Sequence, residues 1–248
     1  MFKRIAIALA LICTLALAGA AQKEKQQQPK AWAEWSKKDA EKVLKDSPWA
    51  QTQVDTDISE MFFQPTSPSS RGVNSSTRAA EGATNQAIDV KYYVRFFTAR
   101  PIRQALARLA LLQNPDNARA AAQLNQFAEL EATKDIIVSV WFESTDNRFG
   151  GKVLQALAQG EASTLRQFTY LERRKDGKRL FLQEYIKPGK VGSFGARFVF
   201  PRNVDGQPFI TPDCGEVRFH TELGTNQDFK VDRRFKLADM MYQGTLEY

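Results

Sequence analysis

The stretch DCGEVRFH, residues 213–220, contains the residue types that a nucleophilic or metal site would need. Cys214 is the only cysteine outside the N-terminal apolar run, and His220 is the only histidine of the chain. A Cys-His dyad needs its two side chains within hydrogen-bond reach. Six strand positions would separate Cys214 from His220 by about 20 Å. We therefore expect no catalytic dyad here, and with so few nitrogen and sulfur ligands no zinc site.

The same stretch fits an ordinary strand of an antiparallel sheet. Val217 and Phe219 alternate with Arg218 and His220, so the two pairs face opposite sides of the strand. This pattern predicts His220 as a cross-strand polar neighbour on a face that is open to water. Cys214 precedes the strand, and we expect it to be either buried or available for pairing with another molecule.

A second candidate is the segment WFESTDNRFGG, residues 141–151. Glu143 and Asp146 follow an apolar run and lie beside Trp141 and Arg148. Loops at strand ends commonly carry functional residues, and two carboxylates beside an aromatic ring suit the binding or cleavage of a sugar. The alternative is a turn that ends the strand, with its acids facing solvent. These four are the candidate ligand-binding residues; no residue is predicted to be catalytic, and no metal or cofactor is expected.

Other catalytic patterns do not occur in the sequence. There is no G-x-S-x-G motif for a serine nucleophile and no glycine-rich motif for binding phosphates. The segments NVDGQ and KDGK do not have the spaced acidic series of a calcium loop, so turns explain them. Carboxylate chemistry is the catalytic class that this composition leaves open.

Residues 1–21 read as a secretory signal peptide. Lys3 and Arg4 precede an apolar run, and small residues follow it at Ala18, Ala20 and Ala21. The run is shorter than the ~20 residues needed to span a bilayer, which disfavours the alternative of an uncleaved anchor. We therefore expect an exported protein, periplasmic or secreted. The mature chain has no further apolar stretch of membrane length, so no transmembrane span is expected there.

Charge and cysteine content limit the partners and the source of stability. Without the signal peptide the chain keeps 33 basic and 28 acidic residues, and the basic ones are scattered among acids. In an exported protein, this surplus favours envelope polymers or lipid headgroups over nucleic acid. A single mature cysteine allows no internal disulfide, so stability must come from a hydrophobic core.

The N-terminal part of the mature chain divides into two segments. Residues 22–63 form a predicted helical arm, in which Ser36 caps a helix with Asp39 in capping-box position. The helix should end at Ser47, which precedes a proline. Residues 64–86 are rich in Ser, Thr, Pro, Gly and Asn and predict a flexible linker.

The main domain is expected over 87–248 and begins with a strand and two helices. Alternation predicts a strand from Ile88 to Phe96. Pro101 opens a helix that places Arg103 on its solvent face. Asn114 caps a second helix that runs to about Thr133, and the short connection predicts an antiparallel helical pair.

The remainder of the chain is predicted to be mostly β. Residues 135–143 are continuously apolar, as in a central strand, and a weak helical pattern follows around 152–158. Asp176-Gly177 predicts a hairpin, and two alternating strands cover 215–223 and 230–237. The fold class is therefore α+β. We expect an antiparallel β-sheet, either single or a two-layer sandwich, packed with the helical pair and preceded by the N-terminal helical arm.

Four segments resemble a group of uncharacterised exported bacterial proteins. They read DAEKVLKDSPWAQ, TYLERRKDGKRLFLQEYIKPG, FVFPR and EVRF. The resemblance implies export and a single structural unit, and it brings no activity or catalytic residue. The functional hypothesis is an exported, non-catalytic protein that binds an envelope protein or polymer. The alternatives are a carboxylate-dependent hydrolase of polysaccharides and a purely structural envelope component.

Overall fold

The computed structural model describes residues 30–57, 87–131, 134–189 and 194–248. Trp35 to Tyr248 form one compact unit, whereas the 3-10 turn η2 (Trp32–Glu34) belongs to a separate N-terminal unit. The expected signal peptide, residues 1–21, and the expected linker, residues 64–86, lie outside the described residues.

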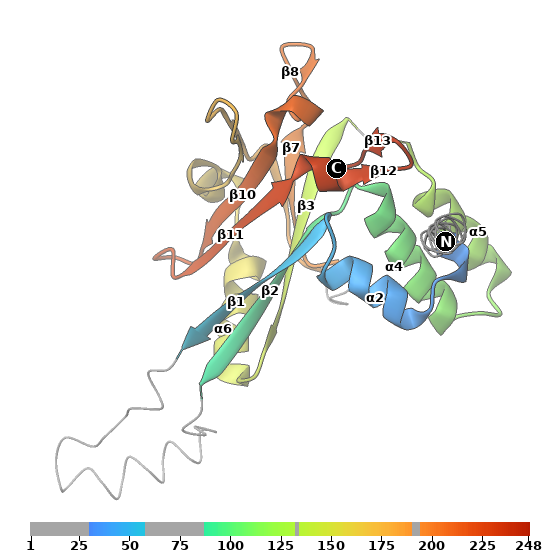
Figure 1. Ribbon diagram of the computed structural model, residues 1–248. Coiled ribbons are helices and arrows are strands. Elements are labelled where there is room, and N and C mark those ends of the chain that lie inside the picture. The colour runs from blue at the N-terminus through green and yellow to red at the C-terminus, as the bar shows by residue number, and fades with distance from the viewer. Residues whose placement is uncertain (1–29, 58–86, 132–133, 190–193) are drawn as a thin grey trace, which may run out of the picture. The chain divides into compact units, whose positions relative to one another are not determined.

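Two antiparallel sheets form the framework (Figure 1). The first sheet has the strand order β1 (Ala50–Asp57), β2 (Ile88–Phe96), β3 (Asp135–Ser144), β7 (Ala196–Pro201) and β6 (Glu184–Ile186). The second has the order β11 (Phe229–Lys236), β10 (Glu216–Leu223), β4 (Tyr170–Arg173) and β5 (Arg179–Phe181). Two short hairpins complete the β structure: β8 (Asn203–Val204) with β9 (Gln207–Pro208), and β12 (Met241–Tyr242) with β13 (Thr245–Leu246). The α+β class and the antiparallel sheet are thus confirmed.

The segment expected as a separate helical arm is part of this framework. Strand β1 pairs with β2 along its whole length, from Ala50 opposite Arg95 to Asp57 opposite Ile88. The preceding helix α2 (Lys37–Lys45) begins at the predicted cap, with the capping box of Ser36 formed in full. The structure therefore places Trp35–Asp57 inside the main unit.

The remaining helices are α4 (Arg100–Gln113), α5 (Ala118–Ala128), α6 (Asn147–Gln159) and the single turn α7 (Ala162–Leu165), with the short 3-10 turns η3 (Arg166–Phe168), η4 (Pro212–Cys214) and η5 (Leu237–Met240). Helices α2, α4 and α5 lie together at the right of Figure 1, away from α6. The expected α4–α5 pair is present, although α5 is shorter than predicted at both ends. Its cap is Asn117 and not Asn114, because the Asn117 side chain accepts a hydrogen bond from Ala120 N at 3.0 Å.

The prediction that Arg103 lies on the solvent face of its helix is wrong. This residue is 3% exposed and does not lie on a solvent face. Its guanidinium donates to the carbonyl oxygens of Thr98, Phe127 and Leu130. An arginine has several donors in a fixed fork, so it can satisfy carbonyl groups that the end of α5 leaves without helical partners.

One bent segment connects the two sheets directly. After β5, Leu182 N donates to the O atom of Thr169, the residue just before β4 of the second sheet, at 3.1 Å. The next residue, Gln183, donates its N–H to Val199 O in the first sheet at 2.9 Å. The chain therefore passes from one sheet to the other without a loop, which joins them along this edge.

The opposite edges, β1 and β11, are joined by glutamine side chains. Gln51 Nε2 donates to Arg234 O at 2.7 Å, and Gln53 Nε2 donates to Lys230 O at the same distance. Gln53 Oε1 also accepts from Asp232 N at 2.8 Å. Free strand edges are templates for pairing with other chains. These two amides cover part of the outer edge of β11 and close the two sheets around a common core.

Aromatic side chains fill that core. Phe96 of β2 packs edge-to-face against Phe235 of β11, with ring centroids 4.8 Å apart. Phe198 of β7 packs in the same way against Phe219 of β10 at 5.4 Å. All four rings are fully buried. Each pair joins one sheet to the other, so the core fixes how the sheets face each other.

Candidate functional site

The structure places Glu143 near the end of β3, in contact with two neighbouring elements. The Tyr93 hydroxyl donates to Glu143 Oε2 at 2.5 Å, and Lys45 Nζ lies 3.2 Å from Oε1. The hydrogen bond from Tyr93, followed by the contact with Lys45, lowers the pKa of Glu143. Partial burial, followed by the hydrogen bond to Glu143, raises the pKa of Tyr93. Glu143 is therefore held as a carboxylate.

Asp146 has a different role, at the beginning of α6. Its Oδ1 accepts from Arg148 N at 2.7 Å, which caps the helix, and its Oδ2 binds the Arg148 guanidinium at 2.7 Å. These hydrogen bonds lower the pKa of Asp146. The Trp141 ring lies 5.3 Å from that of Phe142. Two surface pockets of the described residues, one beside α6 and one beside α2, are not lined by any of the four predicted site residues.

This geometry does not suit acid catalysis at Glu143 or Asp146. A glycoside hydrolase needs one carboxyl group that holds a proton at working pH, which requires a raised pKa. Both carboxyls have a lowered pKa instead. Both are also occupied by donors from the protein itself. A ligand-binding role for the four residues stays a prediction. In the structure, the carboxylates of Glu143 and Asp146 make contacts within the fold.

Cys214 and His220 lie in separate environments, as strand spacing predicts. Cys214 is 3% exposed, and its Sγ contacts Thr211 Oγ1 at 3.2 Å. His220 is 5% exposed, so its predicted position on a face open to water is wrong. The reason is Tyr170 of the adjacent strand, whose ring stacks on the imidazole with centroids 4.9 Å apart.

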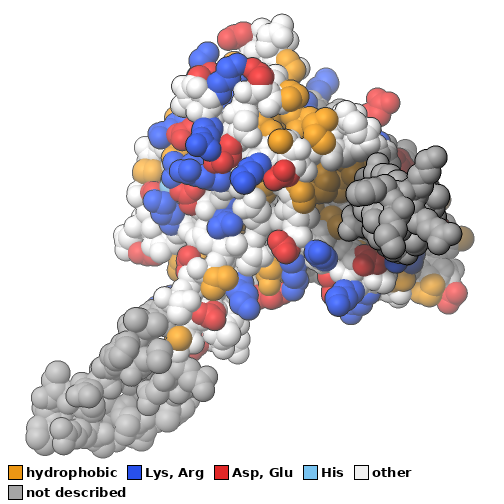
Figure 2. Space-filling view, viewed as in Figure 1, with side chains coloured by type: hydrophobic (Ala, Val, Ile, Leu, Met, Phe, Trp, Pro, Cys, Tyr) orange, Lys and Arg blue, Asp and Glu red, His pale blue; other side chains and the backbone are white. Residues whose placement is uncertain are grey.

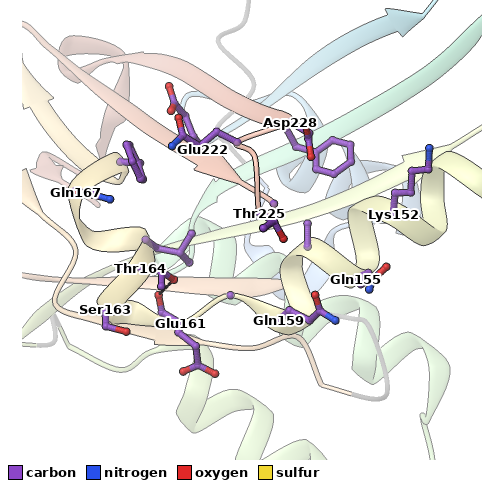
Figure 3. A pocket seen from close by; sticks show the side chains of 17 residues that line it. Lys152, Gln155, Gln159, Glu161, Ser163, Thr164, Gln167, Glu222, Thr225 and Asp228 are labelled. Carbon is purple, nitrogen blue, oxygen red and sulfur yellow. Dashed lines mark hydrogen bonds between the residues drawn. The ribbon is translucent and has the colours of Figure 1, made fainter.

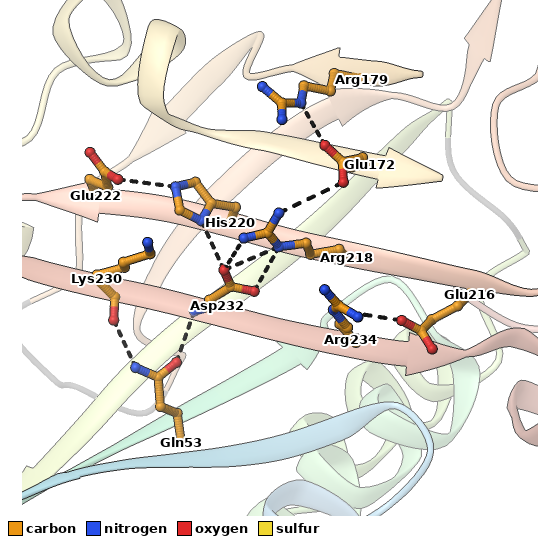
Figure 4. Close-up of polar contacts among 10 residues, drawn as sticks. All are labelled: Gln53, Glu172, Arg179, Glu216, Arg218, His220, Glu222, Lys230, Asp232 and Arg234. Carbon is orange, nitrogen blue, oxygen red and sulfur yellow. Dashed lines mark hydrogen bonds and ion pairs between the residues drawn. The ribbon is translucent and has the colours of Figure 1, made fainter. Parts of the chain in front are cut away.

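His220 belongs to a chain of polar contacts across the outer face of the second sheet (Figure 4). The contacts run in the order Arg179, Glu172, Arg218, Asp232, His220 and Glu222. Arg218 is the main cause of the lowered pKa of Asp232. Figure 2 shows basic and acidic side chains interleaved over this face. These arginines already bind carboxylates, as the scattered charges of the sequence predict.

A polar cleft lies elsewhere, between α6, α7 and the turn that joins β10 to β11 (Figure 3). We call it the helix–turn cleft. Its volume is about 800 Å³, within the range of roughly 300–1,000 Å³ that small-molecule sites occupy. The residues that shape its chemistry are four glutamines, three hydroxyl residues and two phenylalanines: Gln155, Gln159, Gln167, Gln227, Ser163, Thr164, Thr225, Phe168 and Phe229.

Tyr185 of β6 contacts the C-terminal part of α6 and holds the wall of the cleft that α6 and α7 form. Its hydroxyl donates to Leu157 O, near the C-terminal end of α6, at 2.6 Å. Gly160 follows this helix, and a Cβ there would lie 2.8 Å from Tyr185 Cε1. The absence of a side chain at Gly160 therefore lets the aromatic ring approach the helix end. This contact sets where α6 stops and α7 begins.

The opposite wall is tied to the same framework. The buried hydroxyls of Thr169, just after η3, and Thr221 of β10 are hydrogen-bonded at 2.8 Å. The turn itself begins at Gly224, whose φ of +90° is unfavourable for residues with a side chain. The two walls of the cleft are thus held by buried contacts, while the residues that face the opening are mostly exposed.

The glutamine amides of the cleft are available to a ligand. None of the four makes a side-chain hydrogen bond within the part of the chain that the structure describes. Gln155 and Gln159 come from one face of α6, since residues four apart on a helix are neighbours. Each amide offers two donors and an acceptor. The cleft can therefore form many directional hydrogen bonds with a ligand of matching polarity.

The sequence reasoning missed this cleft. It identified only a weak helix around 152–158, whereas α6 extends from Asn147 to Gln159. A signal was present in KVLQALAQGEASTLRQF, where glutamines follow the helical period opposite Val153 and Leu157. The turn of 224–228 is distant in sequence from α6, and only the fold brings them together.

The described residues contain neither a metal-binding cluster nor a membrane-spanning helix. No group of three or more His, Cys, Asp and Glu side chains is arranged there to hold a metal ion. Within the same residues, no helix has the length and apolar character needed to cross a membrane. No protein-family model, curated protein or solved structure matches the chain. The resemblance to exported bacterial proteins stays a prediction.

Proposed function

We propose that this chain is an exported binding protein that holds a polar ligand in the helix–turn cleft without transforming it. The observation that carries the proposal is a set of glutamine amides that line a cleft of about 800 Å³ and have no side-chain hydrogen bond among the described residues. Exposed polar side chains are common, but four amides around one concavity are suited to recognition. Export is inferred from the signal peptide predicted over residues 1–21.

The ionisation of the carboxyl groups supports binding over hydrolysis. Every described carboxyl whose pKa is clearly shifted has it lowered, in each case mainly by a hydrogen bond from a neighbouring side chain: Glu143, Asp146, Asp176, Asp213 and Asp232. A general acid requires the opposite shift. None of these five lines the helix–turn cleft.

Ligand-observed NMR on the mature chain tests the proposal. The probe panel contains neutral oligosaccharides, tetragalacturonate, an uncharged tetrapeptide and a muropeptide. We expect at least one probe to bind and to be recovered unchanged after prolonged incubation. Replacing Gln155 and Gln159 by alanine should weaken binding about 30-fold, because each amide hydrogen bond contributes roughly 1 kcal/mol.

The matched control is the same double replacement on α5. Gln123 and Gln126 are exposed glutamines on a helix that does not line the cleft. Changing both to alanine should leave the affinity unaltered. Equal losses in the two double variants, or binding of no probe, would overturn the proposal. If the protein hydrolyses a probe and the Glu143→Gln variant does not, the hydrolase alternative is correct instead.

A further inference from the structure

The helix–turn cleft has few charged side chains, and most of them are acidic. Its lining contains one basic and three acidic side chains: Lys152, Glu161, Glu222 and Asp228. This balance contrasts with the formal charge of +7 on the whole chain. An anion in this cleft would therefore meet more carboxylates than ammonium groups.

Two of the three acids already have partners outside the lining. Glu161 pairs with Lys187 at 2.5 Å, and Glu222 lies 3.3 Å from Nε2 of His220. The remaining lysine and aspartate have opposite signs and no ion-pair partner within the described residues. Counting Lys187 and taking His220 as neutral, the cleft carries one net negative charge. Neither a strongly anionic nor a strongly cationic ligand is matched by this arrangement.

The neutral groups of the cleft define the ligand more closely. A side-chain amide donates and accepts hydrogen bonds, and so does a serine or threonine hydroxyl. Ligand hydroxyls, which also donate and accept, match such a lining at every position. A phosphate or carboxylate can only accept, so it would leave the amide oxygens without donors. Buried polar groups without partners cost binding energy.

The shape of the cleft favours an extended ligand. Lys152, Gln155 and Gln159 follow one row of α6, and this row is about 10 Å long at 1.5 Å per residue. Half-buried Phe168 and Phe229 add apolar surface to the same cleft. Sugar rings combine hydroxyl edges with apolar C–H faces, so they suit both kinds of surface. The row exceeds the length of a single ring.

We propose that the helix–turn cleft binds an uncharged oligosaccharide of two or more sugar units. The inference rests on the proposed binding function and adds the chemical class of the ligand. A peptide is a poorer match, because a helix such as α6 offers no strand edge along which an extended chain could pair. Gln155 and Gln159 are assigned to sugar hydroxyls, and the two phenylalanines to the C–H face of a ring.

Isothermal titration with four tetrameric probes tests the ligand class. The probes are cellotetraose, maltotetraose, tetra-N-acetylchitotetraose and tetragalacturonate. At least one neutral tetramer should bind, with an affinity that changes little between low and high salt, because no ion pair forms. Tetragalacturonate should bind at least about ten-fold more weakly than the best neutral tetramer. The corresponding disaccharide should also bind more weakly than the tetramer.

Variants locate the binding and separate the two proposals. Gln155→Ala with Gln159→Ala should weaken the neutral tetramer more than ten-fold, whereas Gln123→Ala with Gln126→Ala should not. Circular dichroism confirms that both variants fold. If tetragalacturonate binds best and loses affinity only in the α6 variant, the ligand class is wrong and the binding function stands. If no probe responds to the α6 variant, both are wrong.

Discussion

Gly195 provides a stringent test of how β3 and β7 are paired. It immediately precedes β7, whose first residue, Ala196, lies opposite Val140 of β3. Its φ is +70°, and a Cβ built there would lie 2.3 Å from Val140 O and 2.8 Å from Val140 C. Gly195→Ala therefore creates two separate problems, an unfavourable backbone conformation and a collision with the neighbouring strand.

A matched variant separates the contributions of backbone conformation and collision to the loss in the free energy of unfolding. Gly177 has a similar φ of +66°, but a Cβ there would meet nothing within 4 Å. Gly177→Ala should therefore cost only the left-handed conformation, about 1–2 kcal/mol in the free energy of unfolding. Gly195→Ala should cost that amount plus about 1–3 kcal/mol for overpacking against a backbone that cannot rotate away.

Urea unfolding of the mature chain, followed by circular dichroism, measures both variants. The urea midpoints of two variants can be compared directly if the free energy of unfolding falls with urea concentration at the same slope in both. We expect Gly195→Ala to unfold at a clearly lower urea concentration than Gly177→Ala, which in turn unfolds below the parent protein. Equal midpoints for the two variants would refute the close approach of β7 to Val140, and with it the register at this end of the sheet.

Two further predictions concern residues that the sequence analysis selected. Cys214 is 3% exposed, so a thiol reagent should modify the native protein far more slowly than the urea-unfolded chain; rapid native labelling would contradict its burial. Tyr93→Phe removes the hydrogen bond that contributes most to the lowered pKa of Glu143, so an NMR titration should find this pKa moved upward. A carboxyl group whose pKa is lower in the folded than in the unfolded protein stabilises the fold at pH values above the unfolded pKa. This stabilisation is lost as the pH falls through the folded pKa. The variant should therefore lose less stability on acidification than the parent, and an unchanged pKa would argue against the contact.

Local sequence signals predicted the elements well where the chemistry is itself local. The capping box of Ser36, the hairpin at Asp176 and the alternation of 216–223 each depend on residues a few positions apart. Each of these predictions is confirmed. The central position of β3 also followed from its continuous apolar run, because a strand buried on both faces needs no polar alternation.

Errors arose where a distant segment supplies the partner. Arg103 lies off the apolar stripe of its helix, and this position predicts a solvent-exposed side chain. In the structure its guanidinium donates hydrogen bonds to carbonyl groups at the end of α5. His220 lies on the polar face of β10, but Tyr170 covers it. In both cases, residue type and periodicity gave the direction of the side chain correctly. They could not show what the fold brings in front of it.

The two groups of glutamines in this protein show why a candidate site is harder to predict than a strand. Gln51 and Gln53 bind the backbone of β11 and join the sheets, whereas Gln155 and Gln159 have no partner among the described residues. The amides are chemically identical, and the difference lies only in what stands opposite them. Backbone groups of an edge strand satisfy the first pair, and an open cleft faces the second. Burial and hydrogen-bond partners, which exist only in the folded chain, therefore distinguish a structural amide from one that is free to bind a ligand.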